Sequence, residues 1–287
     1  MKKVLIVGST GYLGKYLVQE CKRRGYWVRA LARNPQKLEE LRDSIDDLFV
    51  GEVTKPETLK GVCDDIDVVI SALGVASSRT DEKISLEEVD YGGNKNVLDR
   101  ALSASVKKFI FVSFIISPAY EPLEITRIKR MFEQALDTSG LDYCIIRPTA
   151  FFADMKEILK LAQKGTVYLL GHGNYRGNPI HGMDLAQFCV DALDRQEKEL
   201  PVGGPDEYSY RESAALAFKV LGQQAKIKTI PGWPLNILLK LMKPFLSKRK
   251  YISIQFLFTA MQSDALAPKF GTHHLEDFFR ELVEKKN

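Results

Sequence analysis

Three glycines near the N-terminus, set between an apolar run and a helical pattern, constrain the fold more than any other feature of the sequence. Gly8, Gly11 and Gly14 follow the run VLIV and open the amphipathic pattern KYLVQECKRRG, after which the apolar run WVRALA begins. Gly8 allows a tight turn, Gly11 lets the backbone approach a pyrophosphate, and Gly14 permits close helix–sheet packing. Because a helix N-terminus offers N–H groups to phosphates, the segment predicts a dinucleotide site, with a glycine-rich turn without ligand as the alternative.

Short apolar runs alternate with stretches of helical length over the first half of the chain. The runs are VLIV, WVRALA, LFVGEV, VVISAL, FIFVS and YCIIRP. This rhythm predicts βαβ units with about six strands from Lys3 to Arg147. After RPTAFF the elements shorten, and helical patterns dominate from about Arg211. We therefore expect an α/β fold, with a Rossmann-type doubly wound parallel sheet at 1–150 and a smaller, mainly helical substrate-binding lobe at 151–287, the two packing as one unit.

The end of the second predicted strand bears on the choice between NAD(H) and NADP(H). About twenty residues after the last glycine, an NAD site places a carboxylate on the ribose 2′-hydroxyl. The chain instead reads LARN, and Arg33 offers a planar fork of donors to a 2′-phosphate. We expect NADP(H) to be preferred over NAD(H); the alternative is a surface arginine without a ligand.

Composition and charge narrow the function classes. Hydrophobic residues make up 45% and charged residues 27% of the 287 residues, as is usual for a globular protein. The net charge is only +4, and basic and acidic residues are interleaved along most of the chain. Nothing in this balance indicates a nucleic-acid partner.

The C-terminal part contains the most apolar segments and one basic cluster. WPLNILLKLMKPFL and YISIQFLFTAM are interpreted as core, with a lipophilic substrate lobe or a partner surface as alternatives. The basic cluster KPFLSKRK, from Lys243 to Lys250, is interpreted as a solvated turn between two helices. Docking of an anionic group or a membrane surface is the alternative.

Cysteine and histidine usage does not indicate a metal site. The cysteines lie in apolar runs without CxxC spacing and are interpreted as reduced core residues: Cys21, Cys63, Cys144 and Cys189. His172, His273 and His274 lack the spacing of metal ligands. The apolar part of MKKVLIVG is too short for a signal peptide, and no stretch reaches about 18 uninterrupted apolar residues. We expect no transmembrane segment and a cytoplasmic location.

Several blocks resemble the atypical short-chain dehydrogenase/reductases. They are the glycine pattern, SALG at Ser71 to Gly74, VDYGGNKNVLDRA from Val89, FVSF around Ser113, and IIRPTAFF at Ile145 to Phe152. RIKRMFE, RPTAFF, NPIHGMDLA and LPVGGP are most similar to the NmrA-like and divinyl chlorophyllide reductase-like branch. The resemblance covers most of the chain and is looser in the C-terminal part.

The resemblance implies a complete cofactor site. It assigns the pyrophosphate to the glycine-rich turn, the 2′-phosphate to Arg33, and the adenine and its ribose to the segments after the third and fourth strands. It assigns the nicotinamide end to Ser113, Lys129 and the segment after the sixth strand. The implied cofactor-binding residues are Gly8, Ser9, Thr10, Gly11, Tyr12, Leu13, Gly14, Arg33, Glu52, Val53, Ala72, Leu73, Gly74, Ser113, Lys129, Pro148, Thr149, Ala150 and Phe151.

The family's acid–base motif, YxxxK, is incomplete in this chain. In the family the tyrosine transfers a proton, and the lysine lowers its pKa and binds the nicotinamide ribose. Lys129 matches the lysine, but Ile125 stands at the tyrosine position and has no transferable proton. Lys129 and Ser113 remain the candidate catalytic residues. A solvated i,i+4 pair of Lys129 with Glu133 is the alternative.

Two further side chains are weaker candidates. Tyr120, in SPAYEPL, lies five residues before the vacated position and is interpreted as a surface loop residue, with a substitute proton donor as the alternative. His181, in NPIHGMD, matches a family segment near the rim of the active site and is interpreted as a structural histidine that hydrogen-bonds a loop.

Two functions from different classes remain open. The first is an NADP(H)-dependent atypical short-chain reductase that transfers hydride to a hydrophobic, conjugated small molecule, with the proton drawn from water or substrate and with Phe151 and Phe152 shaping the pocket. The second is a non-catalytic NAD(P)H-binding sensor or assembly factor, NmrA-like, that contacts a protein partner through its C-terminal helices. The sequence leaves the substrate and the oligomeric state open.

Overall fold

The computed structural model of the protein describes residues 1–74 and 85–285, apart from the side chains of residues 236 and 240. The chain forms two compact units. Unit 1 consists of Met1–Phe114, Glu124–Arg147 and Leu185–Leu200, and unit 2 of Ile115–Leu123, Pro148–Asp184 and Pro201–Asn287. Each unit therefore takes segments from both halves of the chain.

A mostly parallel sheet forms the centre of unit 1. Among the described residues it has seven strands in the order β3-β2-β1-β4-β5-β6-β9. They are β1 (Lys3–Val7), β2 (Trp27–Ala32), β3 (Asp47–Val50), β4 (Val68–Ser71), β5 (Lys108–Val112), β6 (Asp142–Pro148) and β9 (Glu199–Val202). The neighbouring pairs from β3 through β6 are all parallel. After β3, at one edge of the sheet, the chain crosses over to β4, which lies on the other side of β1. This reversal in the direction of strand addition is the doubly wound order.

The sequence of β1 accounts for its central position. Its residues from Val4 to Val7 have no exposed surface, as expected of an apolar run that is covered on both faces. Val7, its last residue, lies opposite Leu31 of β2 and Ser71 of β4. The carboxyl ends of β1 and β4 therefore flank the point where the strand order reverses, and open α/β sheets bind their ligands at this point.

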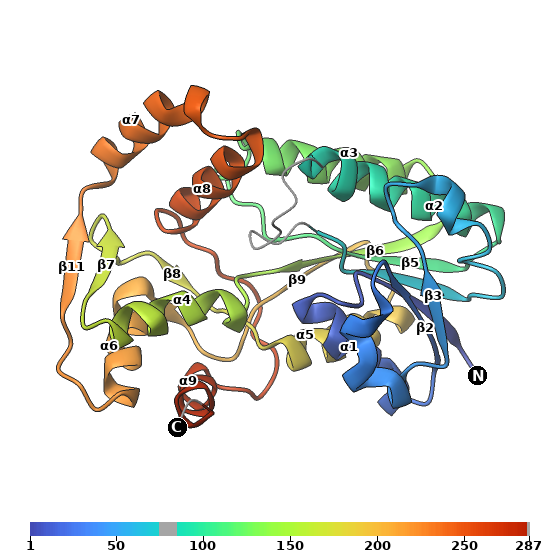
Figure 1. The fold of residues 1–287 in the computed structure, drawn as a ribbon, viewed down its shortest axis with the longest axis horizontal. Coiled ribbons are helices and arrows are strands. Elements are labelled where there is room, and N and C mark those ends of the chain that lie inside the picture. Colours follow the sequence, from blue (N-terminus) through green and yellow to red (C-terminus); the bar gives the residue numbers. More distant parts are fainter. Residues whose placement is uncertain (75–84, 286–287) are drawn as a thin grey trace. The chain divides into compact units, whose positions relative to one another are not determined.

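Helices cover both faces of the sheet in unit 1, with α2 and α3 over one face and α1 over the other (Figure 1). On the first face, Leu98 of α2 and Phe132 and Leu136 of α3 pack on Phe109 and Phe111 of β5 in one buried cluster. The helical elements are α1 (Tyr12–Arg23), η1 (Pro35–Ser44), η2 (Pro56–Leu59), the π-helix η3 (Glu88–Gly93), α2 (Asn94–Ser103), α3 (Glu124–Asp137), α5 (Gly182–Asp191) and η4 (Ala192–Asp194).

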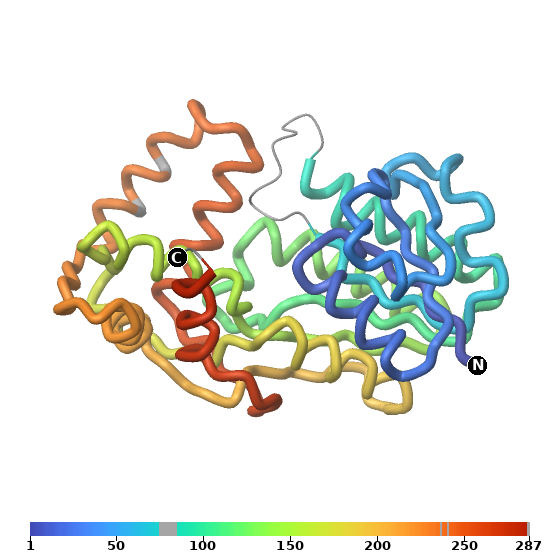
Figure 2. The backbone as a smooth tube through the Cα atoms, turned by 60° about the horizontal axis from the view of Figure 1, so that its bottom comes forward, coloured from blue at the N-terminus to red at the C-terminus, as the bar shows by residue number. Residues whose placement is uncertain are grey.

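Unit 2 combines helices with two small sheets. β7 pairs with β11 in parallel, and β8 pairs with β10 antiparallel. Phe152, Phe218 and Phe279, from α4, α6 and α9, share one buried apolar cluster. α7 and α8 follow each other as a helix pair joined by η5 (Figure 2). The elements are α4 (Phe152–Gln163), β7 (Val167–Leu170), β8 (Arg176–Gly177), β10 (Tyr208–Ser209), α6 (Tyr210–Val220), β11 (Ile227–Ile230), α7 (Gly232–Met242), η5 (Lys243–Phe245), α8 (Lys248–Ala260) and α9 (Leu275–Glu284).

These elements confirm the predicted fold class, a Rossmann-type doubly wound sheet followed by a mainly helical C-terminal region. All the strands predicted between Lys3 and Arg147 are present. β9 was not predicted, because its residues alternate between exposed and buried and lie outside the βαβ rhythm. It joins β6 through a hydrogen bond from Ile145 N to Lys198 O. The functional division at residue 150, into a cofactor domain and a substrate lobe, stays a prediction.

The cysteines lie where their apolar surroundings predicted. All four are buried and free of disulfides. Burial raises the pKa of the Cys21 and Cys63 thiols to about 12, so neither is a ready nucleophile. In the part of the chain that the structure describes, no group of three His, Cys, Asp or Glu residues is placed to hold a metal ion. None of its helices is both long and apolar enough to cross a membrane.

Candidate dinucleotide-binding site

The glycine-rich turn begins at the carboxyl end of β1. Gly8 has a φ of +82°, which favours glycine, and a Cβ added there would lie 2.8 Å from the carbonyl oxygen of Ala72. The amide of Gly11 donates to the carbonyl of Gly8 over 2.9 Å and closes the turn. A Cβ on Gly14 would lie 2.1 Å from the same carbonyl oxygen. Gly8 and Gly14 are therefore required by the backbone itself.

Gly11 is different, because it precedes the first turn of α1. It is the N-cap residue of that helix, no side chain caps the helix, and its first turn contains no acidic residue. A Cβ on Gly11 would meet only the Gly8 carbonyl oxygen, at 3.2 Å. The turn thus leaves the positive end of the helix dipole and its first amides accessible to an anion. This cradle fits a diphosphate, and a side chain at Gly11 would fill it.

The other residues predicted in this turn divide into packing and surface positions. The Ser9 hydroxyl is buried and donates to the carbonyl of Leu31 over 2.7 Å, so it ties the turn to β2. Leu13 is 5% exposed and belongs to the core. The ring of Tyr12 packs edge-on against Tyr16 at 5.3 Å. Ser9 and Leu13 can therefore reach a ligand only through their backbone amides.

Arg33 lies directly after β2 and forms an ion pair with Glu52, which follows β3. Its Nη1 atom donates to Oε2 of Glu52 over 2.9 Å, and the arginine side chain is 40% exposed. Glu52 was predicted to flank the adenine, and this contact was not predicted. The structure thus brings two predicted site residues together at the carboxyl edge of the sheet, where a carboxylate competes with any phosphate for the guanidinium.

Val53 and Leu73 form an apolar floor beside the carboxyl ends of β3 and β4. Both are buried, and both side chains contact Gly93, on which a Cβ would lie 2.9 Å from Val53 Cγ2. The Nδ2 atom of Asn96 donates to the Val53 carbonyl and holds this segment in place. Such a floor suits the face of an adenine ring.

Lys129 forms a buried ion pair with Asp90. The Nζ–Oδ1 distance is 2.9 Å, and the two side chains are only 7% and 4% exposed. Nζ also lies 5.0 Å from the centre of the Phe111 ring. A Cβ on Gly74 would lie 3.7 Å from Nζ, so the ammonium group lies beside the segment that follows β4. The predicted alternative, a solvated pair of Lys129 with Glu133, is wrong, because Lys129 is buried and paired with Asp90.

Asp90 is held in place by its own backbone as well as by the lysine. Its carbonyl accepts from Nδ2 of Asn94 over 2.7 Å, and Oδ1 of Asn94 accepts from the Ser71 hydroxyl over 2.6 Å. These bonds join the end of β4 to the π-helix η3 and to the start of α2. The ion pair with Lys129 is consequently anchored to the sheet rather than to a loop.

Ser113, at the end of β5, belongs to a second buried polar network. Its hydroxyl donates to Oε1 of Glu133 over 2.7 Å. Glu133 accepts two hydrogen bonds of 2.9 Å from Arg147, whose Nε donates to Glu199. Burial lowers the pKa of Arg147, but hydrogen bonds to Glu199 and Glu133 raise it overall, and the guanidinium lowers the pKa of Glu199. Ser113 therefore already has a carboxylate partner.

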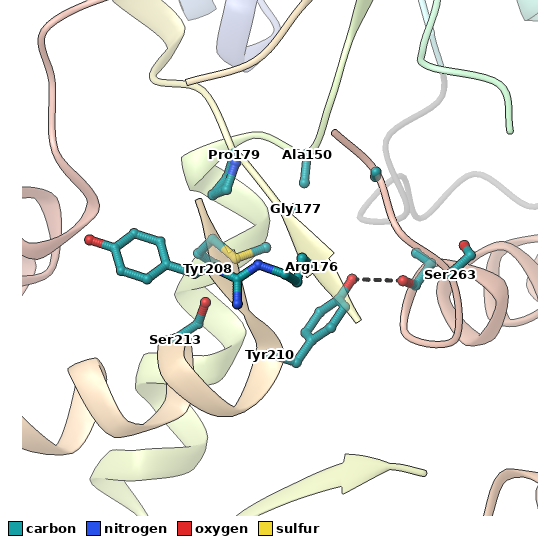
Figure 3. A pocket seen from close by; sticks show the side chains of 11 residues that line it. Ala150, Arg176, Gly177, Pro179, Tyr208, Tyr210, Ser213 and Ser263 are labelled. Carbon is teal, nitrogen blue, oxygen red and sulfur yellow. Dashed lines mark hydrogen bonds between the residues drawn. The ribbon is translucent and has the colours of Figure 1, made fainter. Parts of the chain in front are cut away.

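The candidates after β6 belong to unit 2. Thr149 is buried and its hydroxyl donates to the Asn178 carbonyl over 2.5 Å. Phe151 forms an isolated bridge with Ile180 and precedes α4. Ala150 borders a small, partly open pocket of about 30 Å³ within unit 2 (Figure 3). Phe152 is 1% exposed and lies in the core, so it cannot line a substrate pocket as predicted.

Tyr120 and His181 have structural surroundings in unit 2. Tyr120 was predicted on the surface, but it is 3% exposed and packs on Phe256 at 5.5 Å, because its loop is held in unit 2. Its pKa is raised by burial, against the effect of a hydrogen bond with Ser263. His181 stacks on His273 at 4.4 Å, and its Nδ1 accepts from the amide of Met183 over 3.3 Å. His181 thus has the structural surroundings that were predicted, but the amide that donates to it belongs to the first turn of α5 and not to a loop.

Sequence reasoning missed Asp90, Asn94 and Arg147 as members of the site's polar networks. Asp90 and Asn94 lie within the block VDYGGNKN, where polar residues interrupt an otherwise buried helical pattern. That interruption was the available signal, since buried polar side chains need partners. Arg147 ends an apolar strand run and gave the same signal.

Comparison with known proteins agrees with this geometry. A family model described as NAD(P)H-binding matches residues 8–196. Divinyl chlorophyllide a 8-vinyl-reductase of Zea mays is 30% identical over 98% of this chain and 79% of its own. Photosystem II assembly factor Ycf39 of Cyanophora paradoxa is 28% identical over 79% of this chain and 71% of its own.

The solved structures support the fold. An NADPH-dependent quinone oxidoreductase of Escherichia coli, solved with NADPH, superposes with a TM-score of 0.71 at 16% identity over 98% of this chain and 99% of its own. The sheet order and the glycine turn define a Rossmann-type dinucleotide-binding protein. More closely, the chain belongs to the NAD(P)H-binding family of atypical, NmrA-like short-chain dehydrogenase/reductases.

Proposed function

We propose that the protein is an NADP(H)-dependent reductase that transfers a hydride to a hydrophobic, conjugated small molecule without a catalytic tyrosine. The buried pair of Lys129 and Asp90 beside Gly74 carries the proposal, because it holds a cation at the edge of the sheet where the family binds its cofactor. When bound there, the dinucleotide supplies the hydride. A vinyl reductase among the relatives and a quinone oxidoreductase among the structural neighbours support a reductive reaction.

The chain's own residues bind the pyrophosphate and the adenosine part of the cofactor through different groups. The uncapped first turn of α1 holds the pyrophosphate, while Val53 and Leu73 support the adenine. Arg33 binds the 2′-phosphate with the donors that Glu52 does not use, which favours NADP(H) over NAD(H). The 40% exposure of the Arg33 side chain leaves the guanidinium accessible for this purpose.

Lys129 binds the nicotinamide ribose, and Asp90 is its positioning residue. The ion pair fixes Nζ and leaves its remaining protons to donate to ribose hydroxyls. Ser113 supports the nicotinamide ring or the substrate with the lone pairs of its hydroxyl, whose proton is directed to Glu133. The family resemblance also assigns the nicotinamide end to four residues at and just after the end of β6, namely Pro148, Thr149, Ala150 and Phe151.

The reaction class follows from the residue at position 125. Ile125 lies one helical turn before Lys129 on α3 and cannot transfer a proton. Reduction of a conjugated C=C bond or a quinone requires only that the hydride enters and that a proton is added afterwards, from water or from the acceptor itself. Orientation and exclusion of water are then the main contributions of the protein.

A second function is favoured by a specific observation. The side chains of both catalytic candidates already have buried carboxylate partners, Lys129 with Asp90 and Ser113 with Glu133. A site built in this way can also bind the dinucleotide without turnover. An assembly factor is among the relatives. The alternative is therefore an NAD(P)H-binding sensor or assembly factor that acts through a protein partner.

One experiment separates the two functions. The purified protein is titrated with NADPH and NADH, and NADPH oxidation is then followed with a panel of quinones, enones and porphyrin-like acceptors. Turnover that is lost in Lys129→Met, while NADPH binding remains measurable, supports the reductase. Tight NADPH binding with no turnover across the panel supports the sensor. No uptake of either cofactor contradicts both.

A further inference from the structure

The helix α7 and the adjoining turn η5 expose an unusual number of large apolar side chains. The exposed fractions are 70% for Trp233, 66% for Leu241 and 85% for Phe245, and Ile237, Leu238 and Met242 are 51%, 49% and 40% exposed. Within α7 these residues follow the spacing i, i+4, i+5, i+8, i+9, which places them on one side of the helix. Single exposed apolar residues are common, but a continuous face of this kind marks an interaction surface. We call it the α7 face.

The α7 face lies within the most basic part of the chain. Residues 213–263 contain eight Lys and Arg residues and no Asp or Glu. The eight are Lys219, Lys226, Lys228, Lys240, Lys243, Lys248, Arg249 and Lys250. Because the whole chain carries only +4, the rest of it has a net negative charge. One of the eight, Lys219, pairs with Glu276, whereas Lys243, Lys248 and Lys250 are exposed in η5 and the first turn of α8, directly after α7. The α7 face therefore adjoins exposed basic side chains, which suits a partner that is both apolar and anionic.

We propose that the α7 face docks on an anionic lipid surface, with α7 lying in the plane of the interface. Trp233 and Phe245 enter the boundary between headgroups and acyl chains, and Lys243, Lys248 and Lys250 contact the lipid phosphates. An α7 of 11 residues has a length of about 16 Å, roughly half the hydrocarbon thickness of a bilayer.

The charge pattern favours a lipid surface over a second copy of the chain. Two copies that met through this face would bring two acid-free segments together, and like charges across an interface are unfavourable. An anionic bilayer offers both negatively charged headgroups for the lysines and an apolar acyl-chain region for the exposed apolar side chains. The basic cluster KPFLSKRK was predicted to be a solvated turn between two helices, and the structure does place it between α7 and the first turn of α8. The exposed apolar face beside it gives that turn a function.

The test is vesicle binding by the whole chain, without nicotinamide or acceptor, so that its outcome is independent of the proposed function. Flotation is measured with vesicles of phosphatidylcholine alone and with vesicles that also contain phosphatidylglycerol. The chain has two tryptophans, so in a Trp27→Phe background Trp233 fluorescence reports directly on the α7 face. We expect binding to the anionic vesicles, a blue shift of Trp233 emission, and loss of binding as salt is raised.

Two double variants and two matched controls sharpen the result. Trp233→Ser/Phe245→Ser removes the two most exposed aromatic side chains, and Lys248→Glu/Lys250→Glu replaces two positive charges with negative ones. Each double variant should bind anionic vesicles at least about tenfold more weakly than the wild type. Val50→Ser and Lys55→Glu/Lys60→Glu change exposed residues of unit 1 in the same chemical sense and should have no effect. Unchanged thermal unfolding of every variant excludes misfolding as the cause.

Three results would overturn the proposal. The wild-type chain could fail to bind anionic vesicles at low salt. The two double variants could bind as tightly as the wild type. Sedimentation equilibrium could show a dimer that Trp233→Ser/Phe245→Ser dissociates, which would assign the α7 face to a second copy of the chain.

Discussion

Arg33 donates from Nη1 to Oε2 of Glu52 over 2.9 Å, so the residue proposed to bind the 2′-phosphate already has a carboxylate partner. The two residues follow neighbouring strands, β2 and β3, and Glu52 is the less exposed of the two. Such a pair can influence the choice between NADPH and NADH. The carboxylate orients the guanidinium, and it also competes with the phosphate for the same donors.

The first prediction concerns cofactor preference. Arg33→Ala should weaken NADPH binding about 10- to 100-fold, because a hydrogen-bonded charge contributes roughly 1.5–3 kcal/mol. NADH binding should change little, since it lacks the 2′-phosphate. Glu52→Gln should tighten NADPH binding several-fold by removing the competing charge. Isothermal titration with both cofactors measures these affinities. Arg42→Ala, at an exposed position on η1, is the control, and equal losses for NADPH and NADH in Arg33→Ala would contradict the assignment.

The strands and the glycine turn could be predicted from the sequence because their causes are local. The apolar runs of β1 to β6 are covered on both faces, and the requirement for glycine at positions 8 and 14 follows from one tight turn against one helix. β9 could not be predicted in this way. Its place beside β6 depends on hydrogen bonds to a strand far away in the sequence, and its own residues carry only a weak apolar pattern.

The site was predicted less completely because its polar partners are non-local. Lys129 was identified by its motif, but its partner Asp90 lies on a different helix, and no spacing rule connects the two. Ser113 was likewise identified without Glu133 and Arg147, which fix its hydroxyl. Tyr120 was misplaced on the surface, since the loop sequence SPAYEPL gives no sign of the packing on Phe256. The sequence pattern was enough to identify Lys129 and Ser113 as candidates, but the side chains that they contact depend on the folded structure.

The second prediction concerns the buried ion pair. Lys129→Met and Asp90→Asn should each lower the free energy of unfolding by about 3–5 kcal/mol, because each leaves the other group charged or polar without its partner in the interior. The double variant should lose clearly less than the sum of the two single losses. Urea unfolding in a Trp233→Phe background, where Trp27 is the only tryptophan and reports on unit 1, gives these values. Additive losses would show that the two side chains do not interact.

The third prediction concerns pH. Burial and the neighbouring His273 lower the pKa of His181, against the opposing effect of Asp184 and Glu281. Since the unfolded chain then takes up the proton more readily than the folded one, this contribution to stability is present above the ordinary histidine pKa and is lost as pH falls below about 6.5. Between about pH 7 and pH 5 the melting temperature of the wild type should therefore fall relative to that of His181→Phe, whereas the pKa of His274, which Asp206 raises, acts in the opposite direction in both proteins. His172→Phe, at an exposed position, should retain the wild-type slope.

The fourth prediction separates the role of the glycine turn in folding from its role in binding. At Gly14 a Cβ would lie 2.1 Å from a backbone carbonyl oxygen, and that contact cannot be relieved without moving α1 off the turn. Gly14→Ala should therefore destabilise or unfold the chain. At Gly11 the same atom would meet only that oxygen, at 3.2 Å, so Gly11→Ala should fold, with a melting temperature within a few degrees of wild type.

Cofactor binding by Gly11→Ala should be weakened even though the protein folds, because the glycine at this position lets the backbone approach the pyrophosphate closely and a methyl group obstructs that approach. We expect at least about a tenfold loss of affinity for NADPH and NADH alike, since both carry the same diphosphate. Fluorescence titration with both cofactors, beside a thermal melt of the same preparation, checks this. A folded Gly11→Ala protein with wild-type affinity would place the diphosphate elsewhere, and the assignments of Arg33 and Lys129 would have to be abandoned with it.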